Sequence, residues 1–211
     1  MKIKFFLAAI AALLLSGVVV SAQTPEEIVQ KMSAQLDRCN AEGFSMDFVM
    51  KMPIVGTIRT HEQIFGKKMK TSMSNEEKDV VIWYDETTKW TFDSKDNTVT
   101  VENRALSSSE AEESDMKAFD RLRDGYGFKL QEETPEAWYI LCKKSKTNKD
   151  KDDPKTMDLV VSKADYICKS LTAKVSGVTL KLYDFAFGVD EKLVTFNPED
   201  YPGVEIVDKR K

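Results

Sequence analysis

The stretch Phe44-Ser45-Met46-Asp47-Phe48-Val49-Met50-Lys51-Met52 alternates apolar and polar residues along its whole length. Side chains of a β-strand point alternately to opposite faces, so residues of one parity share a face. One face therefore carries Phe44, Met46, Phe48, Met50 and Met52. The other carries Ser45, Asp47 and Lys51, with Val49 as an exception. We predict a strand with one dry and one wet face, as is common in antiparallel sheets.

The same kind of pattern continues to Val101 and returns after residue 124. Ile58 and Ile64 share a parity in the next segment, and short β-rich segments follow, separated by turn residues. Such spacing predicts an up-and-down meander that forms a curved antiparallel sheet. The expected strands are 44–52, 54–65, 68–73, 80–84, 89–92, 98–101, 125–128, 138–142, 157–161, 167–174 and 179–187.

A helix is expected before the sheet. Thr24, Pro25 and Glu27 have the order of a capping box with proline at the first helical position. Gly43 is placed to end the helix. Because neither can otherwise bury its apolar side, this helix should pack on the dry face of the sheet. Its apolar stripe consists of Ile28, Val29, Met32, Leu36 and Cys39.

The segment after the first meander allows two interpretations. A run of serine and acidic residues at 107–115 leads into Met116, Phe119 and Leu122, whose spacing suits a short helix. The helix could form a lid over one end of the sheet, or the acidic run could be a solvated loop. A second polar run, at 143–155, is expected to be an exposed loop.

Composition excludes several classes of function. The chain has 31 basic and 35 acidic residues, a net charge of -4, and no basic stripe of the kind that binds nucleic acid. His61 is the one histidine, so a multi-histidine metal site is excluded, and no nucleophile elbow or phosphate-binding glycine motif is present. We expect no enzyme activity, no metal and no cofactor.

The N-terminus has the pattern of a signal peptide. Lys2 and Lys4 precede an apolar run at 5–15, and small residues at 20–22 resemble a cleavage site. We expect residues 1–22 to be removed and 23–211 to form one exported domain, although an uncleaved membrane anchor is an alternative. No cysteine follows residue 22 directly, so the mature chain should not carry a lipid anchor.

The three cysteines are Cys39, Cys142 and Cys168. In an oxidising compartment two of them could form a disulfide, and the third thiol would remain free. Cys39 lies on the predicted helix stripe and the other two lie in strands separated by a third strand, which favours a role as buried small apolar residues. The sequence does not decide whether any disulfide forms.

Several segments resemble the periplasmic outer-membrane lipoprotein carrier family, LolA. The similar segments are 81–85 with 89–92, 138–143, 185–187 with Asp190, 194–198 and 203–206. The chain departs from the family pattern at Glu86 and Thr87, where a glycine is expected, and it lacks the family's proline in 138–143. The resemblance extends over nearly all of residues 24–208.

This resemblance implies an α+β fold: an unclosed antiparallel β-barrel covered by the N-terminal helix and a short helical lid. It also implies a soluble, monomeric periplasmic carrier of lipid-modified proteins. Such a carrier would take their acyl chains from an inner-membrane release complex to an outer-membrane acceptor. The family's lid-pinning arginine has no clear counterpart, because Lys67 and Lys68 occupy that area and Arg59 lies one strand earlier.

We predict that an apolar cavity binds the acyl chains and that 116–122 forms its lid. A superfamily member that binds another lipid, an envelope sensor, and an interaction domain filled by its own side chains are the alternatives. The lid residues are Met116, Phe119 and Leu122. The cavity residues are Phe44, Met46, Phe48, Met50, Met52, Ile58, Ile64, Met69, Trp83, Trp90 and Phe92.

Overall fold

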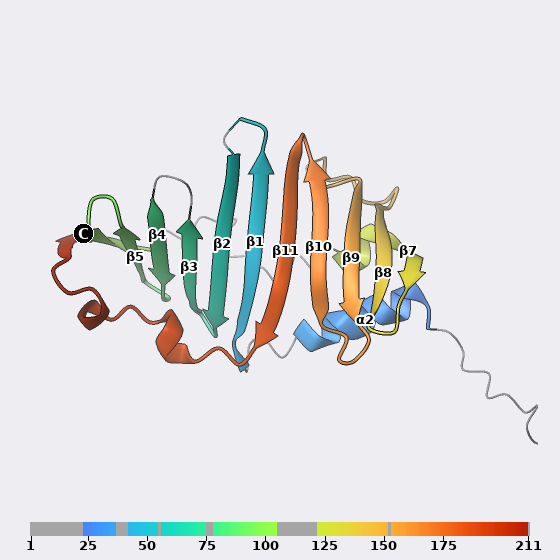
Figure 1. Ribbon diagram of the computed structural model, residues 1–211, viewed down its shortest axis with the longest axis horizontal. Coiled ribbons are helices and arrows are strands. Elements are labelled where there is room, and N and C mark those ends of the chain that lie inside the picture. The colour runs from blue at the N-terminus through green and yellow to red at the C-terminus, as the bar shows by residue number, and fades with distance from the viewer. Residues whose placement is uncertain are drawn as a thin grey trace, which may run out of the picture.

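A computed structural model describes residues 23–36, 42–54, 56–74, 78–104, 122–151 and 153–210. Twelve strands form one sheet in the order β12-β6-β5-β4-β3-β2-β1-β11-β10-β9-β8-β7 (Figure 1). β12 and β7 lie at opposite ends of this order, so the sheet is open. The predicted α+β class with an unclosed antiparallel sheet is confirmed.

The elements agree closely with the segments expected from the sequence, apart from the C-terminal η1, η2 and β12. The helical elements include α2 (Pro25–Leu36), η1 (Glu191–Val194) and η2 (Pro198–Asp200), and residues 122–125 are helical as well. The first strands are β1 (Phe44–Met52), β2 (Gly56–Phe65), β3 (Lys68–Ser74), β4 (Asp79–Tyr84), β5 (Thr88–Asp93) and β6 (Thr98–Asn103). The others are β7 (Tyr126–Glu133), β8 (Ala137–Lys144), β9 (Thr156–Ser162), β10 (Cys168–Val175), β11 (Val178–Phe187) and β12 (Glu205–Asp208).

Two meanders meet in the middle of the sheet. Strands β1 to β6 follow one another in space as in sequence, and so do β7 to β11, so the predicted up-and-down connection is confirmed. The meanders are joined where β1 pairs with β11. β12 adds to β6 in parallel, while the other pairs are antiparallel. The two central strands therefore come from distant parts of the chain.

The predicted capping box starts α2. The Glu27 backbone N–H donates to Thr24 Oγ1 at 3.2 Å, and the Thr24 N–H donates to Glu27 Oε2 at 3.0 Å. These bonds satisfy N–H groups that have no partner within the helix. α2 packs against β7 and β9 (Figure 1). We call the face of the sheet on which α2 lies the helix face, and the opposite one the outer face.

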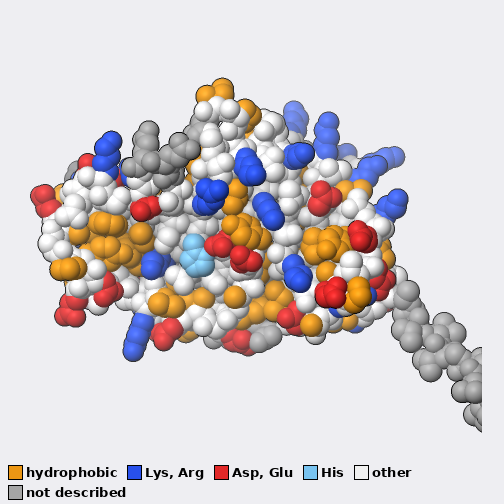
Figure 2. All heavy atoms as spheres, viewed as in Figure 1, with side chains coloured by type: hydrophobic (Ala, Val, Ile, Leu, Met, Phe, Trp, Pro, Cys, Tyr) orange, Lys and Arg blue, Asp and Glu red, His pale blue; other side chains and the backbone are white. Residues whose placement is uncertain are grey.

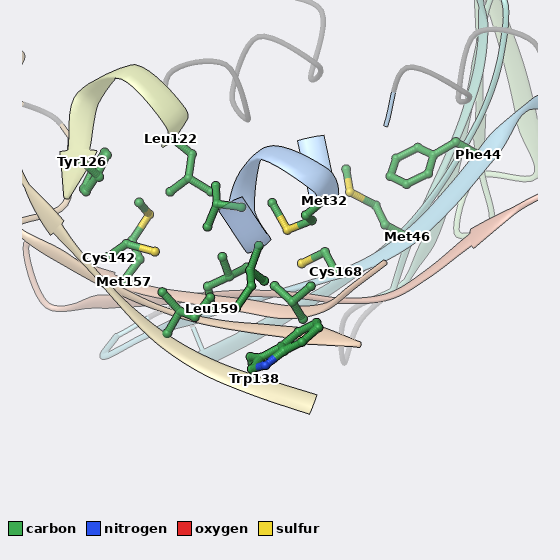
Figure 3. Packing of buried hydrophobic residues seen from close by; sticks show 14 residues of the cluster. Met32, Phe44, Met46, Leu122, Tyr126, Trp138, Cys142, Met157, Leu159 and Cys168 are labelled. Atoms are coloured by element: carbon green, nitrogen blue, oxygen red, sulfur yellow. The ribbon is translucent and has the colours of Figure 1, made fainter. Parts of the chain in front are cut away.

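A helix-side core lies between α2 and the strands from β7 to β1. Ile28, Val29 and Met32 of α2 are fully buried, as the predicted stripe requires. Figure 3 shows Met32 pointing toward the sheet between Leu122 and Met46. The helix-side core consists of Ile28, Val29, Met32, Phe44, Met46, Leu122, Tyr126, Trp138, Ile140, Cys142, Met157, Leu159, Val161 and Cys168.

An aromatic core lies on the outer face of the other half. There the segment that contains η1 and η2 returns across strands β3 to β6. Trp83 contacts the rings of Phe196 and Tyr201, with centroids 5.2 Å and 5.4 Å apart in edge-to-face geometry. Trp90 stacks on Phe196 at 5.8 Å, and Phe92 lies 4.9 Å from Tyr201. Such aromatic pairs stabilise a core beyond their buried area.

The seam between the two meanders depends on Gly43. Its backbone has φ +70, and its carbonyl accepts a hydrogen bond of 3.2 Å from the Gly188 N–H. A Cβ at this position would lie 2.6 Å from the Val189 carbonyl oxygen. Only glycine fits both the left-handed backbone and this close approach. The glycine expected to end the helix thus also joins β1 to the end of β11.

Candidate functional site: an apolar tract on the helix face

Phe44, Met46 and Ile64 lie on the helix face, as their parity predicts. Phe44 pairs with Ile64 across β1 and β2, and Ile64 with Met69 across β2 and β3. Phe44 is 4% exposed and Met46 is 6% exposed, and both belong to the helix-side core. Ile64 packs against the edge of that core. These residues mark where the core ends within the sheet.

The helix face stays apolar beyond this boundary, starting from Leu182, which still packs against the helix-side core. Met50 of β1 lies between Ile58 of β2 and Leu180 of β11 in the register, and Phe48 lies opposite Leu182. All of these side chains are half-buried. We call this region the apolar tract; it consists of Phe48, Met50, Met52, Ile58, Met69, Met73, Ile82, Leu180 and Leu182.

Three members of the apolar tract, Ile82, Leu180 and Leu182, were not predicted from the sequence, whereas Met73 was among the methionines that suggested an apolar cavity. Leu180 and Leu182 come from β11, whose place beside β1 could not be read from local pattern. Met73 and Ile82 have the parity of the helix face through the β3–β4 register. Their alternation within β3 and β4 is a signal that could have placed them there.

Polar side chains interrupt the apolar tract at one point. Thr60 and Thr71 have the parity of the helix face and are buried, and the half-buried Glu62 lies opposite Thr71. Within the residues that the structure describes, no group of three or more His, Cys, Asp or Glu side chains could hold a metal. Apart from this polar interruption, the apolar tract is suited to binding apolar groups.

Trp83, Trp90 and Phe92 do not join the other predicted cavity residues. Trp83 pairs with Lys70 across β3 and β4, and Lys70 pairs with Gln63 of the outer face. Trp83, Trp90 and Phe92 share this parity, so all three lie on the face opposite Phe44. There they belong to the aromatic core, which the protein fills with its own Phe196 and Tyr201. The structure thus divides the predicted set between two faces of the sheet.

Of the three predicted lid residues, the structure describes only Leu122. Met116 and Phe119 lie outside the described residues. Leu122 is 2% exposed and packs in the helix-side core beside α2 (Figure 3). This residue stabilises the core, and the lid stays a prediction.

The basic residues considered for lid control have different positions. Lys67 and Lys68 form ion pairs with Glu86 at 2.9 Å and with Glu191 at 2.7 Å. Lys68 also donates to Thr195 Oγ1 at 3.2 Å, which links β3 to η1. Arg59 is exposed on the outer face. Lys68 therefore holds the C-terminal segment against the sheet.

One depression lies on the outer face. It has a volume of about 430 Å³ and is lined mainly by polar side chains of β1 to β4, with Tyr183 of β11. Among these, His61 Nδ1 lies 2.6 Å from Asp47 Oδ1, and His61 is exposed, as predicted. A second depression of about 200 Å³ lies near Cys168 and Asp184. The lining of the first depression includes Met73 of the apolar tract, and the lining of the second includes no residue of the tract.

Cys142 and Cys168 are free thiols buried in the helix-side core. Burial raises the pKa of Cys142 to about 12, and it also raises the pKa of Cys168. Both thiols are therefore protonated and behave as small apolar groups. Burial likewise raises the pKa of Tyr126 to about 12, and its hydroxyl donates to the Pro154 carbonyl oxygen at 2.8 Å.

No protein-family model matches the chain, and no curated protein matches it in sequence. Several solved structures are similar to the chain at low sequence identity. An uncharacterized conserved protein from Thermus thermophilus is 13% identical, with a TM-score of 0.48 over 89% of this chain and 100% of that one.

Two further solved structures are similar to the chain. A LolA superfamily protein from Nitrosomonas europaea is 11% identical, with a TM-score of 0.32 over 83% of this chain and 99% of its own. LprF from Mycobacterium bovis is 9% identical, with a TM-score of 0.49 over 82% and 96%.

The described residues contain no helix with the length and apolar character needed to span a bilayer. Residues 1–22, the predicted signal peptide, lie outside the described residues.

Proposed function

We propose that this protein is a non-enzymatic carrier that binds the acyl chains of lipid-modified proteins on the apolar tract. The observation that carries the proposal is the continuation of the helix face past the helix-side core. Phe48, Met50 and Ile58 lie on the same face as α2, yet they lie outside the core and remain half-buried.

The energy of such binding is substantial. Each buried methylene contributes about 0.8 kcal/mol, so a chain of roughly fourteen methylenes gains on the order of 10 kcal/mol. Methionine is flexible and adapts to irregular apolar shapes. Met50, Met52, Met69 and Met73 therefore suit a surface that must accept acyl chains and release them again.

The cellular setting belongs to the same proposal. The signal-peptide pattern of residues 1–22 and the sequence resemblance to the LolA family support a soluble, monomeric protein of the periplasm. It would receive lipoproteins from an inner-membrane release complex and pass them to an outer-membrane acceptor. Native mass spectrometry of protein purified from its own periplasm should detect co-purified acylated protein.

A matched pair of variants tests the site. Met50→Asp places a charge in the apolar tract, and Val49→Asp places the same charge one residue away on the outer face. Binding of a fluorescent triacylated lipopeptide should weaken by at least about tenfold in Met50→Asp, because burying a charge without a partner is costly. Val49→Asp should bind as the unaltered protein does.

The result distinguishes the carrier from its alternatives. Equal loss in both variants, at equal folded fraction by circular dichroism, would contradict a site on the helix face. If the unaltered protein binds no lipopeptide and carries no acylated protein, an interaction domain without transport is the better description.

A further inference from the structure

Four exposed cations gather at one end of the outer face. Lys51 lies on β1, Arg59 on β2, Lys174 on β10 and Lys181 on β11. These four residues are called the basic collar below. All four are exposed, and none of them forms an ion pair with a carboxylate in the described part of the chain.

The strand register brings these charges close together. Val49 lies directly opposite Arg59 on one side and Lys181 on the other, and Thr179 lies opposite both Lys51 and Lys174. Lys51 is therefore a diagonal neighbour of Arg59 and of Lys181, and Lys174 is a diagonal neighbour of Lys181. Diagonal neighbours have Cβ atoms about 7–8 Å apart, so the four cations form one cluster on the surface. Like charges so arranged repel one another in an acidic chain of net charge -4. An anionic partner would relieve that repulsion.

An exposed apolar residue lies at the same end of the sheet. Ile54, in the turn between β1 and β2, is 97% exposed, the highest value among the large apolar residues described. Figure 2 shows Lys and Arg side chains above the pale-blue histidine and hydrophobic atoms at the uppermost tip, over the β1–β2 turn of Figure 1. The β10–β11 turn lies at this end too, because Lys51 pairs with Thr179.

We propose that this end of the sheet docks on an anionic phospholipid surface. The basic collar would contact lipid phosphates, and Ile54 would enter the interface between headgroups and acyl chains. Apolar tips beside basic residues bind membranes through both apolar burial and attraction to anionic lipid. A protein hot spot, in contrast, needs surrounding contacts that exclude water from its anchor, whereas Ile54 is 97% exposed and lies at the same end of the sheet as the basic collar.

The position of the tip connects this surface to the apolar tract. The apolar row of β1 runs from Phe44 to Met52, and Ile54 follows two residues later. A membrane docked at the tip would thus lie at the end of the tract. The docking proposal goes beyond acyl-chain binding and does not depend on it, because it requires only the basic collar and Ile54.

Vesicle co-sedimentation tests the proposal. The full mature chain should bind vesicles of phosphatidylcholine mixed with phosphatidylglycerol, and it should be released by salt. It should not bind vesicles of phosphatidylcholine alone. The double variant Lys51→Gln with Lys181→Gln should weaken binding by about 25-fold, at about fivefold per cation. Ile54→Ser should weaken it by about tenfold.

A charge-matched control uses Lys169→Gln with Lys192→Gln. Both lysines are exposed; Lys169 lies at the opposite end of β10 from Lys174, and Lys192 lies in η1. This control should change binding by less than about twofold. Equal weakening in the two double variants, or equal binding to neutral and anionic vesicles, would overturn the docking surface.

Lipopeptide binding measured on the same variants separates the two proposals. Loss of vesicle binding in the Lys51 and Lys181 variant, with unchanged lipopeptide affinity, supports docking as a separate property. An unaltered protein that binds lipopeptide but no anionic vesicle overturns docking alone. One that binds vesicles but no lipopeptide overturns the carrier function alone.

Discussion

The two halves of the sheet bury opposite faces. Strands β7 to β10 are covered on the helix face by α2, which forms the helix-side core. Strands β3 to β6 are covered on the outer face by the segment of η1 and η2, which forms the aromatic core. The change of face occurs across the central strands. There the apolar tract and the basic collar lie back to back.

The difference shows how one open sheet can place an apolar surface and a charged surface back to back. A sheet covered along one whole face would leave a single face for contacts. Here each cover protects one half, so the central strands present apolar side chains on the helix face and cations on the outer face. Four predictions probe whether the two cores are independent and how the seam joins them.

The largest effect is expected in the helix-side core. Ile140 of β8 is 1% exposed, so Ile140→Ala should lower the free energy of unfolding by about 2–5 kcal/mol through lost burial and a residual cavity. Urea denaturation measures this loss. Leu141→Ala, one residue away on the outer face, should cost clearly less; a comparable loss would contradict the assignment of faces.

A smaller and more local effect is expected in the aromatic core. Phe196→Ala removes the ring that contacts Trp83 and Trp90, and because Phe196 is half-buried the cost should be about 2 kcal/mol. Hydrogen exchange should accelerate in β4 to β6 and stay unchanged in β8 and β9. Leu193→Ala, at an exposed position, is the control. Faster exchange across the whole sheet would mean that the two cores unfold as one unit.

The seam should be sensitive to a single methyl group. Gly43→Ala combines a left-handed backbone with a Cβ that would lie 2.6 Å from the Val189 carbonyl, so we expect a loss of about 2 kcal/mol. Gly177 also has positive φ, but a Cβ there meets open space, so Gly177→Ala should cost about 1 kcal/mol. Thermal denaturation compares the two. Equal losses would show that the close approach to Val189 is relieved by local movement.

The smallest effect concerns pH. Because burial raises the pKa of Cys142 from 9.0 to about 12, the folded state keeps the proton that the unfolded chain releases. Stability is therefore fully present below pH 9 and falls as pH rises from there toward 12. We expect a loss of about 1 kcal/mol between pH 8 and about pH 10, and a smaller loss in Cys142→Ala. If Cys142→Ala loses the same stability over this pH range, the loss comes from groups other than Cys142.

Much of the fold could be predicted from local pattern. The capping box at Thr24 and Glu27, the parity of β1 and the turn residues between strands depend on neighbours in sequence, and each appears in the structure where it was expected. Burial of Cys142 and Cys168 as free thiols is the role that their places in the predicted strands favoured. The candidate site was harder, because Leu180 and Leu182 reach it through the β1–β11 pairing.

The sequence by itself determined which residues of each strand share a face, because alternation along a strand follows directly from backbone geometry. Only the tertiary structure decided which face each half buries. Trp83 and Met46 are both apolar residues with buried side chains, and no local signal says that one packs against α2 and the other against Phe196. Which face each half buries depends on where α2 and the C-terminal segment pack against the sheet, and long-range packing alone determines this.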